Sequence, residues 1–464
     1  MKSPVYMILL SAAAALGGFL FGYDTAVVSG TIGSVSAQFG LDELQTGWYV
    51  GCALIGSISG VMFAGWLSDA LGRKPVLLLS AVLFLWSSAG CMLSGSETVL
   101  LAYRIVGGVG VGVASILSPL YISEISTARY RGRLVALYQF AVTAGILSSY
   151  LVNAAVMRHA LSAPPAPEAA EWLHTIFVDE FWRAMLGIEA LPALVFLIIL
   201  FLIPESPRWQ IVHSRESKAA AVMNRLFGPE VVGDQIAEIK GLLRPKTEEK
   251  ATWRMLWQPG FRKALFTGIS LAMLGQFMGV NAVLYYGPVF FEQAGLGGSG
   301  SLDFQIVIGV INVISTLLGM WLIDRIGRKR LIYSGVSGMV VTLALIGLYF
   351  LLQSRYTLQP GLLLALIGLY IFFCAISICT VIFVLLSEMY PARIRGAAMS
   401  AAGLSLWTGT YLIGQLTPWL LAHLAPYGVF WLFGLMCIPY LLITWKLLPE
   451  TTGRSLEEIE TMLR

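Results

Sequence analysis

Long apolar blocks separated by short polar segments dominate the chain. A membrane-spanning helix needs roughly 20 mostly apolar residues, and we count twelve blocks of about that length or more. The pattern predicts an all-α membrane protein with twelve transmembrane helices. The blocks lie at about residues 6–30, 45–68, 76–94, 99–121, 134–157, 183–203, 262–290, 304–323, 331–352, 361–387, 397–423 and 427–447.

Composition supports this prediction. The 464 residues are 57% hydrophobic and 12% charged, whereas about 25% of the residues of a soluble domain are charged. This composition excludes a water-soluble protein. All five cysteines fall inside apolar blocks, and none lies at metal-ligand spacing from a histidine, so we expect packing roles and no metal or cofactor. The first block contains Asp24 and is too long for a signal-peptide core, so it is expected to be the first span.

The basic residues predict the orientation. With the N-terminus in the cytoplasm, 26 of the 30 Lys and Arg residues fall on the cytoplasmic side. Only Arg158, Arg183 and Arg355 fall outside, and Arg104 lies within a span. The positive-inside rule therefore places both termini in the cytoplasm. Short outer loops without a glycosylation sequon favour a bacterial inner membrane.

One long polar segment divides the spans into six and six. We expect an N-terminal bundle at 1–205, a cytoplasmic helical linker at 206–260, a C-terminal bundle at 261–448 and a cytoplasmic tail at 449–464. Within the linker, segments 215–227 and 231–243 have helical composition.

Three charged motifs recur at matching places in the two halves. An Asp followed by Gly-Arg-Lys comes after the second and eighth spans, a Glu seven residues before an Arg comes after the fourth and tenth, and Pro-Glu comes after the sixth and twelfth. Ion pairs between helix ends could form a gate there; the alternative is a set of solvated loops that only aid topology. Because single surface pairs are weak, a gate needs a network. The candidate gate residues are Asp69, Arg73, Glu124, Arg131, Glu205, Arg208, Asp324, Arg328, Glu388, Arg395 and Glu450.

Together with other strings, these motifs resemble the sugar porter family of the major facilitator superfamily. The strings are Gly22 to Ala26, Tyr103 to Gly108, Pro204 to Trp209, Gln276 to Asn281 with Tyr285-Tyr286, and Pro449 to Arg454. The resemblance runs nearly from end to end. It implies two six-helix bundles that rock around a central cavity and expose a midplane binding site to each side in turn.

Three ionisable residues inside spans suggest proton coupling. Asp24, Arg104 and Glu189 lie at compatible depths, and charges in hydrocarbon are costly and usually functional. Protonation of Asp24 would release Arg104 and remove charge before the carrier closes. In the xylose–proton symporters that the chain resembles, the matching Asp is the proton site. The alternative is a static, neutralising pair.

A sugar site is implied by the same resemblance. Amides suit hydroxyl groups because each offers donors and an acceptor, and an aromatic face covers the C–H surface of a sugar ring. The resemblance assigns these roles to Gln139, Gln276, Asn281, Asn312, Phe21, Trp407, Phe383, Tyr285 and Tyr286. For a lone amide, the alternative is an interhelical hydrogen bond. Gly275, Gly279, Gly287 and Pro288 would let the seventh span bend.

Four positions depart from the family pattern. Gly275, Ile146 and Leu406 stand where polar residues are usual, and Phe383 replaces a Trp. The tenth span also lacks the usual Gly-Pro pair. Fewer hydrogen bonds to hydroxyls imply either a weaker site or a substrate with fewer or differently placed hydroxyls, such as a pentose, a deoxysugar or a polyol.

The expected function is import of a monosaccharide with a proton. The alternatives are an uncoupled sugar or polyol uniporter and, less favoured because the tail is short, a sugar-sensing receptor. No nucleophile–base pair or phosphate loop indicates an enzyme. The expected partners are a monosaccharide (a pentose, a hexose or a related polyol), protons and the lipid bilayer, with no nucleic acid.

Overall fold

The helices are those of a multi-span membrane protein. The computed structural model describes residues 4–163, 171–228, 232–233, 236–237, 257, 259–390 and 395–448. In these ranges, 11 helices are long and apolar enough to cross a membrane. The last, Ala397–Leu447, has 51 residues, about 75 Å of helix against a hydrocarbon core of about 30 Å. It joins two spans at Ala425, whose φ of 54° and ψ of 165° are not helical. The prediction of twelve spans is confirmed.

The chain divides into two compact units. Unit 1 comprises Met1–Val27, Cys52–Val152 and His159–Glu248, and unit 2 comprises Val28–Gly51, Asn153–Arg158 and Glu249–Arg464. Unit 1 thus contains most of the N-terminal half of the chain, and unit 2 contains the C-terminal half together with parts of the first, second and fifth helices. The predicted division at residues 205 and 260 stays a prediction.

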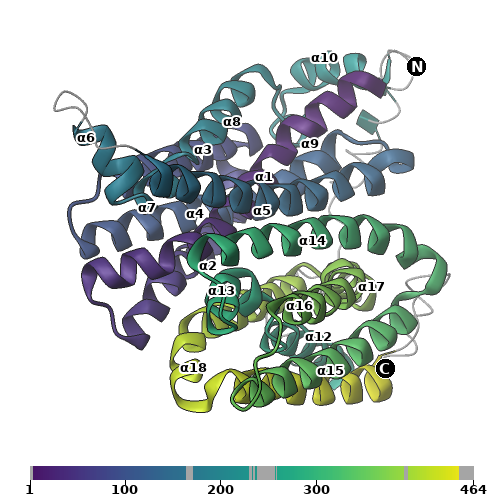
Figure 1. The fold of residues 1–464 in the computed structure, drawn as a ribbon. Coiled ribbons are helices and arrows are strands. Elements are labelled where there is room, and N and C mark those ends of the chain that lie inside the picture. The colour runs from purple at the N-terminus through teal and green to yellow at the C-terminus, as the bar shows by residue number, and fades with distance from the viewer. Residues whose placement is uncertain are drawn as a thin grey trace. The chain divides into compact units, whose positions relative to one another are not determined.

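Unit 1 is built from packed helices (Figure 1), and glycines allow some of them to approach closely. A Cβ atom at Gly22 would overlap the carbonyl of Val142, and one at Gly145 would overlap the carbonyl of Phe19. The first and fifth helices therefore touch through their backbones, as small residues permit in membranes. The helices of this half are α1 (Pro4–Phe39), α2 (Glu43–Leu71), α3 (Arg73–Leu93), α4 (Glu97–Ile125), α5 (Ala128–Ser162), α6 (Glu171–His174), η2 (Thr175–Asp179), α7 (Trp182–Gly187), α8 (Ala190–Leu202), α9 (Pro207–Val212) and α10 (Glu216–Phe227).

The segment after the sixth span is partly helical, as predicted. Helix α10 matches the predicted helix at 215–227. It packs on α9 around a small apolar core that includes Ile211, Ala219 and Met223. Of the second predicted helix, 231–243, only 232–233 and 236–237 are described, and these are helical.

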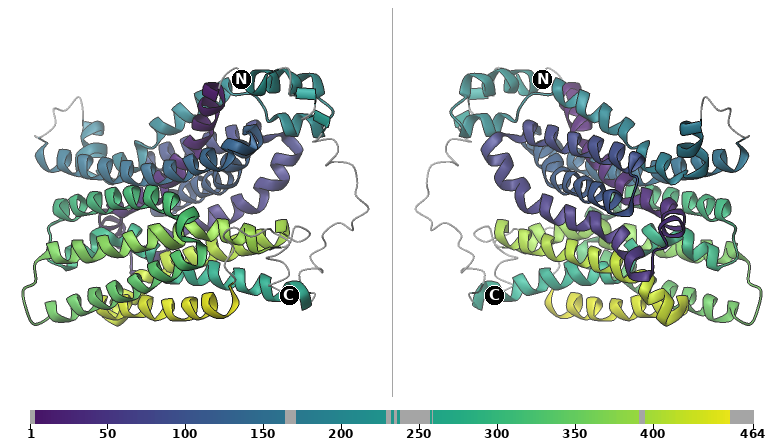
Figure 2. Two further views of the ribbon diagram at one scale, coloured as in Figure 1. Left: turned by 90° about the vertical axis from the view of Figure 1, so that its right-hand side faces the viewer. Right: turned by 90° about the vertical axis from the view of Figure 1, so that its left-hand side faces the viewer.

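The helices of unit 2 lie side by side with roughly aligned axes (Figure 2). The seventh span is broken, because α12 ends at Phe277 and α13 begins at Val280, with Gly279 left-handed between them at φ 88° and ψ 13°. The predicted bend is therefore present, at a residue type that takes positive φ without strain. The helices are α12 (Pro259–Phe277), α13 (Val280–Gln293), α14 (Gly298–Ile326), α15 (Arg328–Gln353), α16 (Pro360–Cys374), η4 (Ala375–Cys379), α17 (Thr380–Met389) and α18 (Arg395–Leu447).

The two Gly-Arg-Lys motifs share one backbone shape. Gly72 has φ 109° and ψ 163°, and Gly327 has φ 94° and ψ 154°. This region is accessible almost only to glycine. Each glycine ends one span and starts the next within a single residue, which fixes where the following Arg and Lys begin their helix.

Candidate transport site

The buried charge in unit 1 starts from an ion pair between α1 and α4. Arg104 Nη1 donates to Asp24 Oδ1 at 3.1 Å. The two residues are 80 positions apart in the chain. Asp24 is 6% exposed and Arg104 3% exposed. The pair predicted from the sequence is therefore formed inside the helix bundle.

Glu189 completes this cluster. It lies between α7 and α8 and is 4% exposed. Its carboxylate interacts electrostatically with both Asp24 and Arg104, and its Oε1 accepts no hydrogen bond from the described residues. Two carboxylates and one guanidinium carry a net charge of −1 when all are ionised. Because net charge is costly in an apolar interior, the cluster is suited to take up one proton and become neutral.

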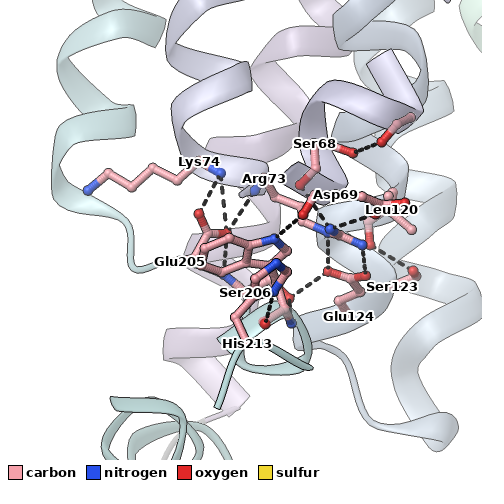
Figure 3. Close-up of polar contacts among 12 residues, drawn as sticks. Ser68, Asp69, Arg73, Lys74, Leu120, Ser123, Glu124, Glu205, Ser206 and His213 are labelled. Carbon is pink, nitrogen blue, oxygen red and sulfur yellow. Dashed lines mark hydrogen bonds and ion pairs between the residues drawn. The ribbon is translucent and has the colours of Figure 1, made fainter. Parts of the chain in front are cut away.

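The first Gly-Arg-Lys motif organises a polar network at the ends of α2, α3 and α4 (Figure 3). Arg73 donates from Nε and Nη2 to the two oxygens of Glu124, both at 3.0 Å. Its Nη1 donates to Asp69 Oδ1, also at 3.0 Å, and to the Ser68 carbonyl. Such a bidentate Arg–carboxylate contact is among the stronger polar contacts in proteins.

Glu205 links the same network to the segment after the sixth span. Its carboxylate accepts the backbone N–H groups of Arg73, Lys74 and Ser206 (Figure 3). Burial raises the pKa of the Glu205 carboxyl, and these N–H donors act in the opposite direction. The Ser206 hydroxyl donates to Glu124. The Pro-Glu-Ser string is thus tied to the Gly-Arg-Lys turn.

Unit 2 repeats part of this arrangement. Arg328 Nη2 donates to Glu388 Oε1 at 3.1 Å, and Nη1 donates to the carbonyl five residues earlier, at Ile323, as Arg73 does at Ser68. Lys329 Nζ donates to the Leu448 carbonyl at 2.7 Å. Lys74 Nζ likewise donates to the Phe201 carbonyl, at 2.9 Å. In both halves, the Lys therefore binds carbonyls at the end of the sixth helix.

The contacts described here do not include ion pairs for the remaining predicted gate residues. Arg131 and Arg208 are exposed, and neither forms an ion pair within the described residues. Glu450 and the side chains of Asp324 and Arg395 lie outside the described part. The gate therefore stays a prediction.

Gln276 is the centre of a neutral polar cluster in unit 2. Its Oε1 accepts from Asn281 Nδ2 at 2.7 Å and from Thr410 Oγ1 at 3.1 Å. The Gln276 amide N–H groups and the Asn281 carbonyl oxygen have no partner among the described residues. Sequence reasoning missed Thr410. A signal existed, because Thr410 lies one helical turn after the predicted Trp407 and so shares its face.

The other predicted sugar residues belong to both units. Tyr285, Tyr286, Asn312 and Trp407 are buried in unit 2. The Tyr286 hydroxyl donates to the Gly414 carbonyl at 2.6 Å. Gln139 and Phe21 are half-buried residues of unit 1, and the side chain of Phe383 lies outside the described residues.

These features define the class of protein as a polytopic helical transporter with duplicated motifs. Known proteins identify the family. The pattern described as "Sugar (and other) transporter" matches residues 10–463. The arabinose-proton symporter of Bacillus subtilis is 35% identical over 460 residues, covering 98% of this chain and 95% of its own length. The D-xylose-proton symporter of Escherichia coli K12 is 35% identical over 490 residues, covering 98% and 96%.

Solved structures agree. The inward open conformation of the xylose transporter XylE from Escherichia coli matches with a TM-score of 0.83 and 33% identity, covering 99% of this chain and all of that one. The chain therefore belongs to the sugar transporter family of the major facilitator superfamily. It is a transporter and not an enzyme, as the sequence predicts.

Proposed function

We propose that this chain imports a monosaccharide together with a proton by alternating access. The observation that carries the proposal is the buried cluster of Asp24, Arg104 and Glu189. A facilitator without coupling has no need of two buried carboxylates beside one guanidinium. The relatives named as proton symporters support the same function.

The proton step follows from charge balance. Arg104 donates a hydrogen bond to Asp24 at 3.1 Å and can neutralise one of the two carboxylates. When the site is open to water, a proton on Asp24 or Glu189 removes the net negative charge. The neutral cluster can then be enclosed at lower cost. Enclosure thus requires a proton, and this requirement couples the proton to the sugar.

Sugar recognition would use the uncharged cluster. Gln276 and Asn281 hold each other in place and leave two amide N–H donors and one carbonyl acceptor for hydroxyls. Trp407 would supply the aromatic face and Gln139 further hydrogen bonds. Because Gly275, Ile146 and Leu406 offer no polar side chains, we propose a pentose, a deoxysugar or a polyol as substrate. Relatives named for arabinose and xylose favour a pentose.

The motif networks would act as gates at the cytoplasmic side. The abundance of Lys and Arg at that end supports this orientation, with both termini cytoplasmic in a bacterial inner membrane. The Arg73 and Arg328 networks would keep the helix ends of each unit rigid while the units rock.

Uptake by purified protein in sealed proteoliposomes tests the proposal. Counterflow first identifies the transported sugar among pentoses, hexoses, deoxysugars and polyols. Accumulation of that sugar is then measured with an inward proton gradient and after a protonophore has collapsed it. We expect accumulation above equilibrium only with the gradient. Equilibration at the same level in both conditions would instead identify an uncoupled uniporter.

A further inference from the structure

Two cysteines meet in the tenth span. Cys374 is the last residue of α16 and Cys379 is the last of η4. Their Sγ atoms lie 3.6 Å apart. Cys374 is 1% exposed, and Cys379 is partly exposed. Both thiols are free, so the span carries a close dithiol that no transport step described above uses.

The local helix geometry creates this pair. In an α-helix, residues five apart point about 140° away from each other around the axis, because each residue turns about 100°. Residues Ala375–Cys379 instead form a π-helical turn, in which residues five apart are in register. The two thiols are therefore neighbours only while this turn stays π-helical.

Side-chain hydrogen bonds and close packing hold the turn. Thr380 Oγ1 donates to the Ala375 carbonyl at 2.7 Å, and Ser377 Oγ donates to the Phe373 carbonyl at 2.6 Å. These hydroxyl groups provide hydrogen-bond donors for the Phe373 and Ala375 carbonyls. The segment 374–380 contains no glycine or proline, so the irregular turn has no such local cause. A π turn inside a helix frequently marks a functional site.

Glycines on two neighbouring helices allow the π-helical turn to pack closely against them. A Cβ atom at Gly319 of α14 would lie 2.6 Å from Thr380 Oγ1 and 3.0 Å from the Ile376 Cα. A Cβ atom at Gly335 of α15 would overlap the Ser377 side chain. The π-helical turn therefore packs against both α14 and α15. If the turn changed to α-helical geometry, these two helices would have to move.

We propose that Cys374 and Cys379 form a binding site for trivalent arsenicals, and that an arsenic atom bridging both sulfurs holds the turn π-helical and stops transport. An arsenoxide, R–As=O, reacts with two thiols to give R–As(SR)₂ and water. Two As–S bonds form, the oxygen leaves with both thiol protons, and arsenic keeps its oxidation state. Thiolate sulfur is a soft ligand suited to such a centre. No oxidant is required.

Binding is tested with phenylarsine oxide, a membrane-permeable probe, on the full chain in detergent. Intact-mass measurement should show one phenylarsenic unit per chain, resistant to a monothiol and removed by a dithiol. Cys374→Ser and Cys379→Ser should each lose that adduct, whereas a variant with Cys52, Cys91 and Cys437 changed to Ser should keep it. A wild-type chain without the adduct, or a Cys374→Ser chain that retains it, would overturn the proposed site.

Locking is tested by counterflow in proteoliposomes, and this second readout rests on the proposed transport function. Phenylarsine oxide should abolish counterflow by wild type and by the variant lacking Cys52, Cys91 and Cys437, with recovery after dithiol treatment. Cys374→Ser should keep its counterflow in the presence of the probe. Full counterflow by a chain that carries the adduct would refute the lock. Because the mass measurement does not depend on transport, failure of the site and failure of the function are distinguishable.

Discussion

The two units place different chemistry on a duplicated scaffold. The site in unit 1 is charged and almost fully enclosed, with Asp24 and Arg104 each less than a tenth exposed. The cluster around Gln276 in unit 2 is uncharged; Gln276 and Asn281 are partly exposed, and Thr410 is buried. Protonation changes the energy of a carboxylate most where the surroundings have a low dielectric constant, because burial there disfavours the charged form. A proton-coupling site therefore needs to be enclosed. Hydroxyl recognition needs accessible donors and acceptors. Under the proposed function, unit 1 would carry the proton and unit 2 most of the sugar contacts.

Duplication is stronger at the helix ends than in the middle of the spans. Both halves keep the Gly-Arg-Lys turn with its Arg–Glu and Lys–carbonyl contacts. Counted back from the matching motif glutamates by equal numbers of residues, Arg104 corresponds to Gly368, and Glu189 corresponds to Gly434. The ionisable cluster therefore has no counterpart in unit 2. The two halves therefore share the contacts that connect the helix ends, but they differ in the polar residues buried within the spans.

Asp24→Asn gives the largest expected effect. It removes the carboxylate bound to Arg104 and leaves Glu189 to neutralise the guanidinium, so the cluster is neutral without a proton. Accumulation driven by a proton gradient should be lost, while counterflow of the same sugar persists. Both are measured in proteoliposomes.

Glu43→Gln is the matched control, because it removes an exposed carboxylate at the start of α2. It should leave accumulation unchanged. Normal gradient-driven accumulation by Asp24→Asn would remove the coupling role and leave the pair with a structural role alone.

Arg104→Gln should mainly destabilise the fold. It leaves Asp24 and Glu189 buried without a cation, and loss of one partner from a buried pair costs about 3–5 kcal/mol. The apparent melting temperature in detergent should fall clearly. Adding Asp24→Asn should restore part of it, because one uncompensated charge disappears. Arg355→Gln, at an exposed arginine, should change nothing; equal melting of Arg104→Gln and Arg355→Gln would contradict a buried ion pair.

The sequence predicts much of the fold but less of the sites. Apolar blocks and the repeated turns predict twelve spans because both follow from local chemistry. The π turn at Ala375–Cys379 could not be predicted, since the missing Gly-Pro pair suggests a straight helix. The turn is held partly by local bonds from Thr380 and Ser377 to carbonyls of the same span, and partly by packing against Gly319 of α14 and Gly335 of α15. Likewise, nothing in a linear pattern predicts that Val28–Gly51 joins unit 2.

Arg73→Gln tests the motif network of unit 1. Arg73 makes a bidentate contact with Glu124 and a further contact with Asp69. We expect about 2–4 kcal/mol of destabilisation because charge-assisted hydrogen bonds are lost and Glu124 is left without this cation. Thermal unfolding in detergent measures the loss, and Arg225→Gln, at an exposed arginine of α10, is the control. Equal unfolding temperatures of the two variants would show that these contacts do not stabilise the helix ends.

Gln276→Ala should weaken sugar binding without affecting coupling. It removes up to two hydroxyl contacts and the partner of Asn281, together worth about 1–3 kcal/mol, or roughly a 5- to 150-fold loss of affinity. Binding of the identified sugar by calorimetry measures this loss, and the proton dependence of the remaining uptake should be unchanged. Gln353→Ala, at the end of α15, is the control. Unaltered affinity of Gln276→Ala would move the sugar site away from this cluster.

Thr410→Val is the smallest and most specific change. Valine keeps the shape and removes the hydroxyl that bonds Gln276 at 3.1 Å. The same hydroxyl donates to the Leu406 carbonyl four residues earlier. Threonine side chains in helices often form such bonds, so the sequence alone does not indicate that Thr410 also contacts Gln276. Losing one hydrogen bond of about 0.5–1.5 kcal/mol should weaken sugar affinity about 2- to 10-fold. Thr408→Val removes an exposed hydroxyl that bonds only the Leu404 carbonyl among the described residues, and should leave affinity unchanged. If both variants bind the sugar equally well, the Thr410 hydroxyl does not contribute to sugar affinity, and only Gln276 and Asn281 remain as candidate sugar-binding residues of this cluster.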